Sequence, residues 1–431
     1  MGKRAAGGVQ RKPAVRKKPA ASDARAGPAV EQRAHKPGAV VSRGVRAVGW
    51  QLRNDKPAMR IWSVGGGVDA LPFAMHLLGI AQPTIEVSVE PNLDAAHFQV
   101  RCASHNHVYH RPEDLTPGSK APCCKHAGQL CQLPFSKPDA LVGVVADWKE
   151  AKDDDDQSVG ARLMCAIRRS AATYFVFVVQ CNAPGCLTNM TDALGDAYSV
   201  AMQPSVSLAL SGAPLGGASA FVFGASKRAA TDAAAVARSF VAMLQHCPNT
   251  VSHYDQIRSE RPPSRKPAQP FDPDTSAIYW GTIKAGIAAA KTTGLWRDGV
   301  HALPAAGERT SEHMAAVRVS GKQQAHGDLF QALIGEGAIC DISKTPVAAT
   351  CKLAQVVGML PPLLKSSMPW SMSHREIVSP ADILAMKGIT HTPQLNEFSS
   401  SDAMTLACTA PSAILIAFAL AAIASATGHA M

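Results

Sequence analysis

Apolar and polar residues follow strand-like and helix-like patterns in turn through the first half of the chain. Residues 59–64 form a short β-compatible run that stops at three glycines, and apolar residues then recur at helical spacing from Leu71 to Leu78. Residues 84–90 alternate apolar and polar positions as a half-buried strand does, and they end at Glu90. Strand, glycine turn, helix and strand together predict a parallel pair joined by a right-handed crossover.

The same kind of pattern continues to about residue 245. Further strand patterns cover 140–145, 174–179 and 220–223, and helical patterns cover 159–170 and 229–245. Strands that alternate with helices are typical of an open α/β sheet. We therefore predict a mixed α/β fold built on such a sheet.

The second half of the chain is less regular. Residues 258–275 are rich in proline and charge and predict a linker, while residues 276–370 are only weakly periodic. Ser379 followed by Pro380 predicts the start of a helix that runs through Lys387. A smaller domain within 258–370 is therefore expected to interrupt the main fold.

The last apolar stretch, residues 411–427, has no charged residue and is rich in alanine. Its 17 residues fall short of the roughly 20 that a helix needs to cross a bilayer. A short membrane anchor and a helix buried between the sheet and a second domain both fit this composition. We favour the buried helix because the stretch is only weakly hydrophobic.

The excess of positive charge lies at the amino-terminal end. Residues 1–56 contain 14 lysines and arginines and 3 acidic residues, whereas the whole chain has 43 and 33. This segment has almost no large apolar residue before Val40, so we predict a disordered basic tail. Such a tail suits contacts with nucleic-acid phosphates or an import signal, and the alternative is a solvated tail without a partner.

The location of the protein is predicted from two absences in the sequence. The basic tail lacks the apolar core of a secretory signal. The eleven cysteines are irregularly spaced and do not form a dense disulfide framework. These features indicate a reducing, intracellular compartment, with the nucleus as one candidate.

A glycine pattern marks the candidate cofactor site. Gly65, Gly67 and Ala70 match G-x-G-x-x-G/A, and Glu90 ends the next predicted strand, where a carboxylate can accept hydrogen bonds from ribose hydroxyls. Glycine lets the backbone approach a ligand, and the helix start offers unpaired N–H groups. The pattern alone leaves open S-adenosylmethionine, an NAD-type dinucleotide and a plain tight turn.

The order of several segments resembles the DNA cytosine-5 methyltransferases. The similar segments are WSVGGGVDALPFAMHLLGI, VSVEPNLDAAHF, HRPEDL, PDALVGVV and ATYFVFVVQCNAPG, followed near the C-terminus by LPPLLKSS, REIVSPADILAMKGI and FSSSDAMTLACTAPSAILIAFALAAI. The resemblance covers about 59–224 and 355–426. It implies a Rossmann-like S-adenosylmethionine-dependent methyltransferase fold with a smaller inserted domain, S-adenosylmethionine as cofactor, and DNA as substrate.

The resemblance also assigns cofactor contacts. It implies that Trp62 packs on the methionine part of the cofactor, that the backbone turn is Gly65, Gly66 and Gly67, that Glu90 holds the ribose, and that Asp114 accepts a hydrogen bond from the adenine amine. Two positions depart from the family. Val64 stands where the family has its first glycine, and Thr409 replaces the asparagine of the closing segment.

The catalytic positions depart further. The family uses a thiolate that attacks C6 of cytosine, in a Pro-Cys pair directly after the PDALVG strand. This chain has Asp147 there, or Ala146 in another alignment. Gln180 stands at the position of the glutamate that hydrogen-bonds the base, and Ser219 replaces an arginine. The resemblance therefore implies weakened or lost methyl transfer.

Cysteines and histidines before the PDALVG strand offer two alternatives. Cys131 opens CQLPFS, which resembles the family's Cys-Gln-Pro-Phe-Ser with one insertion, and is kept as an alternative nucleophile. Cys123, Cys124, His126 and Cys131 could instead form part of a zinc site. Because a clean second pair is absent, we interpret them as loop cysteines, interpret His105, His107 and His110 as surface histidines, and assign no metal.

We predict a basic tail at 1–56, a methyltransferase-like domain at 57–257, a linker and target-recognition-like region at 258–370, and a returning segment at 371–431. The favoured function is a DNA (cytosine-5)-methyltransferase-like protein that binds S-adenosylmethionine. Three alternatives remain: an active enzyme, a catalytically silent relative that binds nucleic acid or the cofactor, and an unrelated protein that binds an NAD-type dinucleotide or is anchored in a membrane. DNA is the expected partner through the tail, RNA is the alternative, and no membrane partner is expected.

Overall fold

The computed structural model describes residues 36–48, 59–65, 68, 70–80, 83–111, 115–145, 159–179, 185–247, 254–259, 276–305, 308–309, 319–335, 338–354, 358–390 and 392–427. Contacts divide the chain into Met1–Arg33 and Ala34–Met431, and the first of these units lies outside the described residues. Most of the predicted basic tail therefore also lies outside them.

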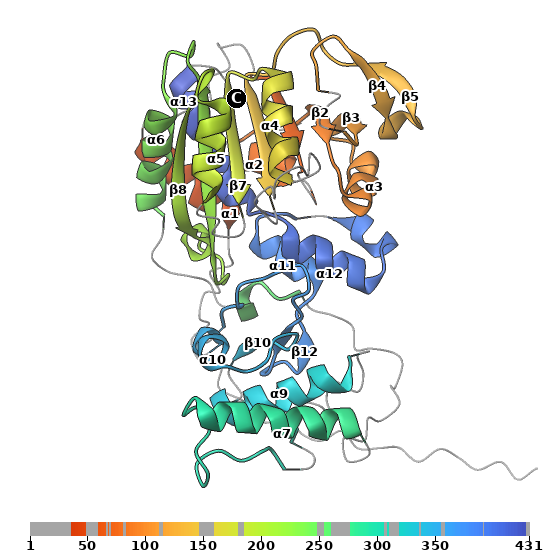
Figure 1. The fold of residues 1–431 in the computed structure, drawn as a ribbon, viewed down its shortest axis with the longest axis vertical. Coiled ribbons are helices and arrows are strands. Elements are labelled where there is room, and N and C mark those ends of the chain that lie inside the picture. The colour runs from red at the N-terminus through yellow and green to blue at the C-terminus, as the bar shows by residue number, and fades with distance from the viewer. Residues whose placement is uncertain are drawn as a thin grey trace, which may run out of the picture. The chain divides into compact units, whose positions relative to one another are not determined.

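A seven-stranded sheet is the centre of the described fold, with the strand order β3-β2-β1-β6-β7-β9-β8 (Figure 1). Neighbouring strands from β3 to β7 are parallel, whereas β9 is antiparallel to both β7 and β8. The strands are β1 (Ile61–Val64), β2 (Ile85–Val89), β3 (His105–Tyr109), β6 (Ala140–Val145), β7 (Tyr174–Val179), β8 (Tyr198–Ser207) and β9 (Ala218–Ser226). The predicted open α/β sheet is confirmed.

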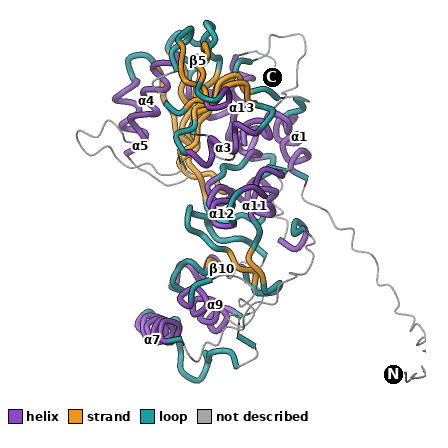
Figure 2. Tube along the Cα trace, turned by 90° about the vertical axis from the view of Figure 1, so that its right-hand side faces the viewer, coloured by secondary structure: helices purple, strands orange, loops and turns teal. Residues whose placement is uncertain are grey.

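Helices cover both faces of this sheet. Figure 2 shows α4 and α5 on one side of the strands and α1 and α13 on the other. The helices of the sheet domain are α1 (Pro37–Ala47), α2 (Ala70–Leu77), α3 (Leu93–Arg101), α4 (Val159–Ser170), α5 (Gly185–Leu194), α6 (Ala233–Gln245), α11 (Pro380–Met386), α12 (Ser400–Thr409) and α13 (Ala413–Thr427). Two apolar cores result, one on each face of the sheet.

The C-terminal helix α13 is a core element. It packs against α2, α6 and α1, and its residues Ala413–Ala424 are buried. Among the described residues, Ser400–Thr427 is long and apolar enough to cross a bilayer by length and composition, with a mean hydropathy of 2.2, but 94% of that window is buried within the protein. The predicted buried helix is therefore confirmed.

Helix α1 corrects the prediction that residues 1–56 are disordered throughout. Val40, Val41 and Val45 are buried on one face of the helix, which packs against α13 and α6. Gly44 allows the close approach, because a Cβ there would lie 2.4 Å from a ring carbon of Phe418. Three valines and a glycine at helical spacing form a narrow apolar stripe that the high charge of the segment obscured.

The region between α6 and α11 has small cores of its own. Helices α7 (Ala277–Thr292) and α9 (Gly321–Ile334) pack together, and the Tyr279 hydroxyl donates a hydrogen bond to Asp328. A second core surrounds the buried Trp370. The remaining elements are α10 (Ala348–Ala354) and a three-stranded sheet of β10 (Ile339–Asp341), β11 (Pro369–Ser371) and β12 (Glu376–Ile377). This region therefore has apolar cores of its own, and its assignment as a separate domain stays a prediction.

The small three-stranded sheet continues past residue 370. The boundary predicted between residues 370 and 371 falls inside β11, which pairs with both β10 and β12. The small sheet therefore extends to Ile377. The helix predicted after Ser379 is confirmed as α11, since the Ser379 hydroxyl accepts a hydrogen bond from the Asp382 N–H.

A two-stranded hairpin, which the sequence patterns did not predict, lies beside β3. Its strands are β4 (Lys120–Cys123) and β5 (Gln129–Gln132), joined through the 3-10 helix η2 (Cys124–His126). Contacts join β3 to β4 and to η2. The hairpin therefore covers the edge of the main sheet.

Candidate functional site

The strand order places a topological switch point between β1 and β6. The crossover from β1 leads through α2 to β2 on one side, and the crossover from β6 leads through α4 to β7 on the other. In open α/β sheets, ligands bind outside the carboxyl ends of the strands at such a point. Gly65 and Glu90, which directly follow β1 and β2, therefore lie at the expected edge.

Gly65 begins the turn that leaves β1. Its φ is +64°, in the left-handed region that favours glycine. Its N–H donates to the Val89 carbonyl at 2.7 Å, and a Cβ here would lie 2.8 Å from the Val144 carbonyl oxygen. The turn is therefore pressed against the ends of both β2 and β6. Gly66 and Gly67 lie outside the described residues.

Glu90 follows β2 and is held by a polar network. It is 3% exposed, and its carboxylate accepts hydrogen bonds from the Asn92 N–H at 2.9 Å and from Gln99 Nε2 at 3.4 Å. Gln99 Oε1 accepts from the Ser88 hydroxyl at 2.7 Å, and Ser88 is 2.8 Å from the Ser63 hydroxyl. The network fixes Glu90 next to the Gly65 turn. The sequence analysis did not identify Ser63, Ser88 or Gln99 as its supports.

Trp62 precedes Ser63 on β1 and therefore points to the opposite face of the sheet from Ser63. It is fully buried in the same apolar core as Val87, Tyr109 and Leu115. Its indole Nε1 has no hydrogen-bond partner among the described residues. Asp114 lies outside the described residues, but its neighbour Leu115 is in this core. Contact of Trp62 with the methionine part of a cofactor stays a prediction.

The two principal catalytic positions follow the ends of β6 and β7. Strand β6 ends at Val145 and β7 ends at Val179, on adjacent parallel strands. Asp147 and Gln180, predicted at the nucleophile and glutamate positions, lie outside the described residues. Their roles therefore stay predictions.

Ser219 lies near the end of β7, because Ala220 pairs with Val179. It is 7% exposed and lines a cavity of about 70 Å³. That volume is below the roughly 300–1,000 Å³ of typical cofactor pockets. The other polar side chains of the lining include Lys387 and Ser412, from the segments around α11 and α13.

A second, larger hollow of about 320 Å³ lies away from the candidate site. Its lining comes from α2, from Pro83 before β2, and from the C-terminal part of α3 with the residues that follow it. Thr390, Thr392 and Gln394 complete the lining. Pro83 precedes β2 and Ser104 precedes β3, so the hollow lies at the amino ends of these strands. Of the predicted cofactor residues that the structure describes, Trp62, Gly65, Glu90 and Thr409, none lines it.

Thr409 is the last residue of α12, and Lys387 bonds backbone carbonyls at the same helix end. The Thr409 hydroxyl donates to the Thr405 carbonyl at 2.8 Å, within its own helix. Lys387 is 3% exposed, and its Nζ donates to the carbonyls of Ala407, Cys408 and Ala410 at 2.9, 2.9 and 2.6 Å. Burial lowers the pKa of Lys387 to about 8. Lys387 thus caps the segment that carries Thr409, a role that the sequence analysis missed.

The structure does not bring Cys131 to the end of β6. Cys131 lies on β5, where its Sγ is 3.2 Å from His126 Nδ1, and the hairpin contacts β3. Three strand spacings, on the order of 14 Å in total, separate β3 from β6. Cys131 therefore lies on the far side of β1 and β2 from the predicted nucleophile position.

Two interpretations of single residues near the hairpin are wrong. Cys123, taken as a loop cysteine, lies on β4 and is fully buried, and His105, taken as a surface histidine, is 1% exposed on β3. His107 and His110 are half-buried. Strand β3 was not predicted because three of the residues at 105–109 are polar or charged, although the strand pairs with β2 along its length.

Solved structures with similar folds were found, although no protein-family model and no curated protein matches the sequence. A protein assigned as a DNA modification methyltransferase, encoded within an E. coli prophage, matches with a TM-score of 0.50 at 11% identity, over 86% of this chain and 100% of that chain. The S. pombe Dnmt2 methyltransferase gives 0.45 at 8% identity, over 85% and 98%. A Spodoptera frugiperda DNMT2 variant gives 0.43 at 10% identity, over 85% and 99%.

The first of these matches bears on the fold. At 11% identity, the likeness to the prophage protein concerns the arrangement of helices and strands alone. It agrees with the mixed α/β fold and the mostly parallel seven-stranded sheet described above. The predicted Rossmann-like α/β fold is thereby confirmed.

Proposed function

We propose that this chain is a DNA (cytosine-5)-methyltransferase-like protein that binds S-adenosylmethionine and nucleic acid, and that it has lost methyl transfer to cytosine. The observation that carries the proposal is the junction of β1 and β2, where the Gly65 turn is bonded to Val89, next to the buried carboxylate of Glu90. This junction lies at the switch point of a sheet with a methyltransferase-like fold.

The described residues fit a cofactor that carries a ribose. Glu90 is fixed at the carboxyl end of β2, where an acid can accept from ribose hydroxyls. Gly65 leaves out the Cβ that would meet the Val144 carbonyl, so the backbone turn stays tight against the sheet. When bound, S-adenosylmethionine would supply an electrophilic methyl group. The chain's own contribution is to orient the ribose and to keep the turn closed.

The sheet supports S-adenosylmethionine over an NAD-type dinucleotide. The dinucleotide-binding fold has the strand order 3-2-1-4-5-6, whereas here an antiparallel strand, β9, lies between β7 and β8. The C-terminal helix α13 also packs against α1, α2 and α6 of the sheet domain, as the resemblance implies for the family's closing segment. The NAD-type alternative is therefore the second candidate.

Calorimetry with the full chain is expected to detect binding of S-adenosylmethionine or its demethylated product, and weaker or no binding of NAD. Glu90→Ala is expected to weaken cofactor binding about 10- to 100-fold, because hydrogen bonds to a charged group contribute roughly 1.5–3 kcal/mol. Glu86→Ala, on the same strand, is the matched control and should bind as the unmodified protein does.

Glu90→Gln serves as a second variant because Glu90 also supports Gln99. It keeps the shape of the side chain while removing its charge. If NAD binds more tightly than S-adenosylmethionine, or if both Glu90 variants bind the cofactor with unchanged affinity, the cofactor assignment is wrong.

The basic residues of the first 33 positions support the nucleic-acid part of the proposal. They include nine lysines and arginines and two acidic residues, while the chain beyond residue 56 is close to neutral. Lysine and arginine contacts with phosphates release counterions, so the affinity falls steeply as salt rises. DNA is the proposed partner and RNA is the alternative.

A chain that begins at Ala34 is expected to lose most of its affinity for duplex DNA at low ionic strength, and its remaining affinity should depend less on salt. The cut is placed before α1 because that helix is part of the core. Full-length protein with the nine basic residues changed to glutamine is the control for chain length. Fluorescence anisotropy across a salt series measures the affinity for duplex DNA and its dependence on salt. Equal affinity of the full-length, truncated and glutamine-substituted proteins would show that the tail is not the binding segment.

A further inference from the structure

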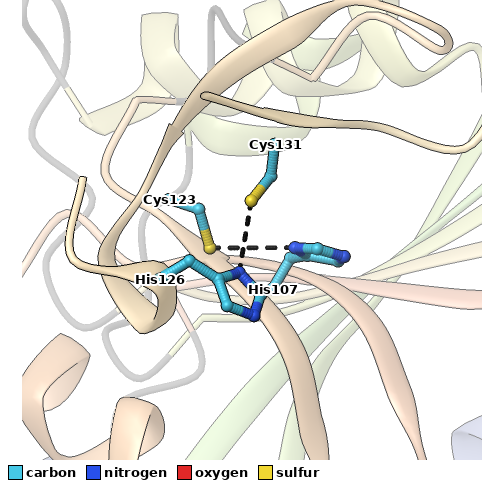
Figure 3. Close-up of side chains that lie close together, drawn as sticks. All are labelled: His107, Cys123, His126 and Cys131. Atoms are coloured by element: carbon cyan, nitrogen blue, oxygen red, sulfur yellow. Dashed lines mark hydrogen bonds between the residues drawn. The ribbon is translucent and has the colours of Figure 1, made fainter. Parts of the chain in front are cut away.

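Four side chains of metal-ligand type converge at the edge of the sheet, apart from the candidate cofactor site (Figure 3). They are His107 on β3, Cys123 on β4, His126 at the end of η2 and Cys131 on β5. Each offers one nitrogen or sulfur atom, and these atoms all lie within 4.8 Å of one another. In Figure 3 the two thiols and the two imidazoles face a common centre.

The distances within this group suit a single small ion. Cys123 Sγ is 3.8 Å from His107 Nδ1, and Cys131 Sγ is 3.2 Å from His126 Nδ1. With Zn–S bonds of about 2.3 Å and Zn–N bonds of about 2.0–2.1 Å, the ligands of a tetrahedral zinc lie roughly 3.3–3.8 Å apart. The group therefore needs only a small contraction to reach zinc geometry.

The hairpin supplies three of the four ligands from a segment of nine residues. Two consecutive left-handed residues, Ala127 (φ 53°) and Gly128 (φ 80°), turn the chain, and the Gly128 N–H donates to the Cys123 carbonyl at 2.8 Å. This turn brings His126 and Cys131 to the same side as Cys123. The fold of the hairpin therefore brings together the three residues of the Cys-x2-His-x4-Cys segment.

The fourth ligand comes from the edge strand of the main sheet. The His107 ring lies 5.0 Å from that of His126, centroid to centroid, and β2 and β1 separate its strand, β3, from β6. Lys125 also connects the hairpin to the start of β3, since its Nζ donates hydrogen bonds to the Cys102 and His105 carbonyls. An ion at this point would join the hairpin to β3.

The hairpin has little other means of stabilisation. Leu130 is 66% exposed, and only Ala121 and Cys123 of its two strands are buried. An isolated two-stranded hairpin is marginally stable in water, and small units with few buried residues commonly depend on a metal or a disulfide. A metal ion is therefore consistent with the poor core of this segment.

We propose that His107, Cys123, His126 and Cys131 bind one Zn²⁺ in a closed tetrahedral site that fastens the β4–β5 hairpin to the edge of the sheet. Two thiolates and two imidazoles are ligands that zinc accepts in structural sites. Four protein ligands leave no open position for water or substrate, so the site stabilises the fold and takes no part in catalysis. A two-iron cluster with the same ligand types holds both thiolates on one iron and both imidazoles on the other, whereas here each thiol lies beside an imidazole.

Metal analysis of the full-length protein tests the proposal. Protein purified without chelator is expected to contain one zinc per chain, and Cys131→Ser and His126→Ala are each expected to lose most of it. These two ligands are less buried than Cys123, so their replacement leaves the core in place. Cys124→Ser is the matched control, because Cys124 is next to Cys123 and outside the cluster, and it should keep one zinc per chain.

Cobalt and trypsin give two further measurements. Co²⁺ added to metal-free protein should produce the visible bands of tetrahedral cobalt and thiolate-to-cobalt charge-transfer bands, and Cys131→Ser should lose them. Removal of the metal should also speed cleavage by trypsin after Lys125. Three results would each overturn the proposal. The first is freshly purified protein that contains no zinc and gives no cobalt bands, the second is zinc retained by both ligand variants, and the third is a disulfide between Cys123 and Cys131.

Discussion

Full-length protein incubated with tritiated S-adenosylmethionine and cytosine-containing DNA is expected to transfer no label above background. The reaction of the DNA cytosine-5 methyltransferases needs a thiolate that adds at C6 of the base, and the resemblance predicts Asp147 at that position. A carboxylate is a harder and weaker nucleophile toward that carbon. Gln180 cannot donate the proton that a glutamic acid at its position would donate. Because catalytic groups act as a unit, losing them lowers the rate by several orders of magnitude.

The position of Cys131 strengthens this expectation. It lies in the cluster with His107, Cys123 and His126 beside β3, and β2 and β1 lie between β3 and β6. Cys131→Ser is therefore run beside the unmodified protein in the same assay. Transfer by the unmodified protein that disappears in Cys131→Ser would contradict the expectation and make Cys131 the nucleophile. Transfer that survives in this variant would also contradict it, and Cys181, which follows Gln180, would then be the next thiol to replace.

Lys387→Met is expected to lower the free energy of unfolding by about 3 kcal/mol. The substitution removes the donor for three buried carbonyls at the end of α12, and each carbonyl left without its donor costs about 1–3 kcal/mol, partly offset by the removal of a buried charge. Lys352→Met is the control, since Lys352 is exposed in the last turn of α10. Chemical denaturation measures the free energy of unfolding of both variants. Equal midpoints for Lys387→Met and Lys352→Met would show that the Lys387 contacts contribute little to stability.

The effect of Lys387 is also expected to depend on pH. Burial lowers its pKa to about 8 from 10.5, so between these values the unfolded chain binds more protons than the folded one. Stability contributed by Lys387 therefore rises with pH across this window. The difference between the unmodified protein and Lys387→Met should widen by about 2 kcal/mol from pH 7.5 to pH 9.5. A difference that narrows over this range would contradict the assigned direction.

The strands and helices of the central sheet could be predicted because their patterns are locally clear. Residues 140–145 and 174–179 are continuous apolar runs, which a strand buried on both faces requires, and they are β6 and β7. Helix α4 also spans its predicted residues, 159–170. The polar strand β3 and the short helix α1 depend on tertiary partners, so their sequences carried weaker signals.

The candidate site was predicted less completely than the fold. Gly65 and Glu90 could be proposed from the sequence because a glycine turn and an acid at the end of the next strand have a fixed spacing. The supports of Glu90 come from two strands and a helix, and the donor that caps α12 comes from the end of α11, so no local pattern reports them. His107 joins the cluster only because β3 lies beside the hairpin.

The packing of α1 against α13 sets a constraint on how the chain folds as it is synthesised. Gly44 lies against Phe418, and α13 covers α2, so one face of the sheet is completed by residues from the opposite end of the chain. While the ribosome makes the intervening segment, the apolar side of β1 and β2 has no final cover. Contacts of such long sequence separation slow folding and leave apolar surface open to aggregation. Efficient production of this protein in cells is therefore expected to depend on chaperones that hold the amino-terminal half until the last helix is released.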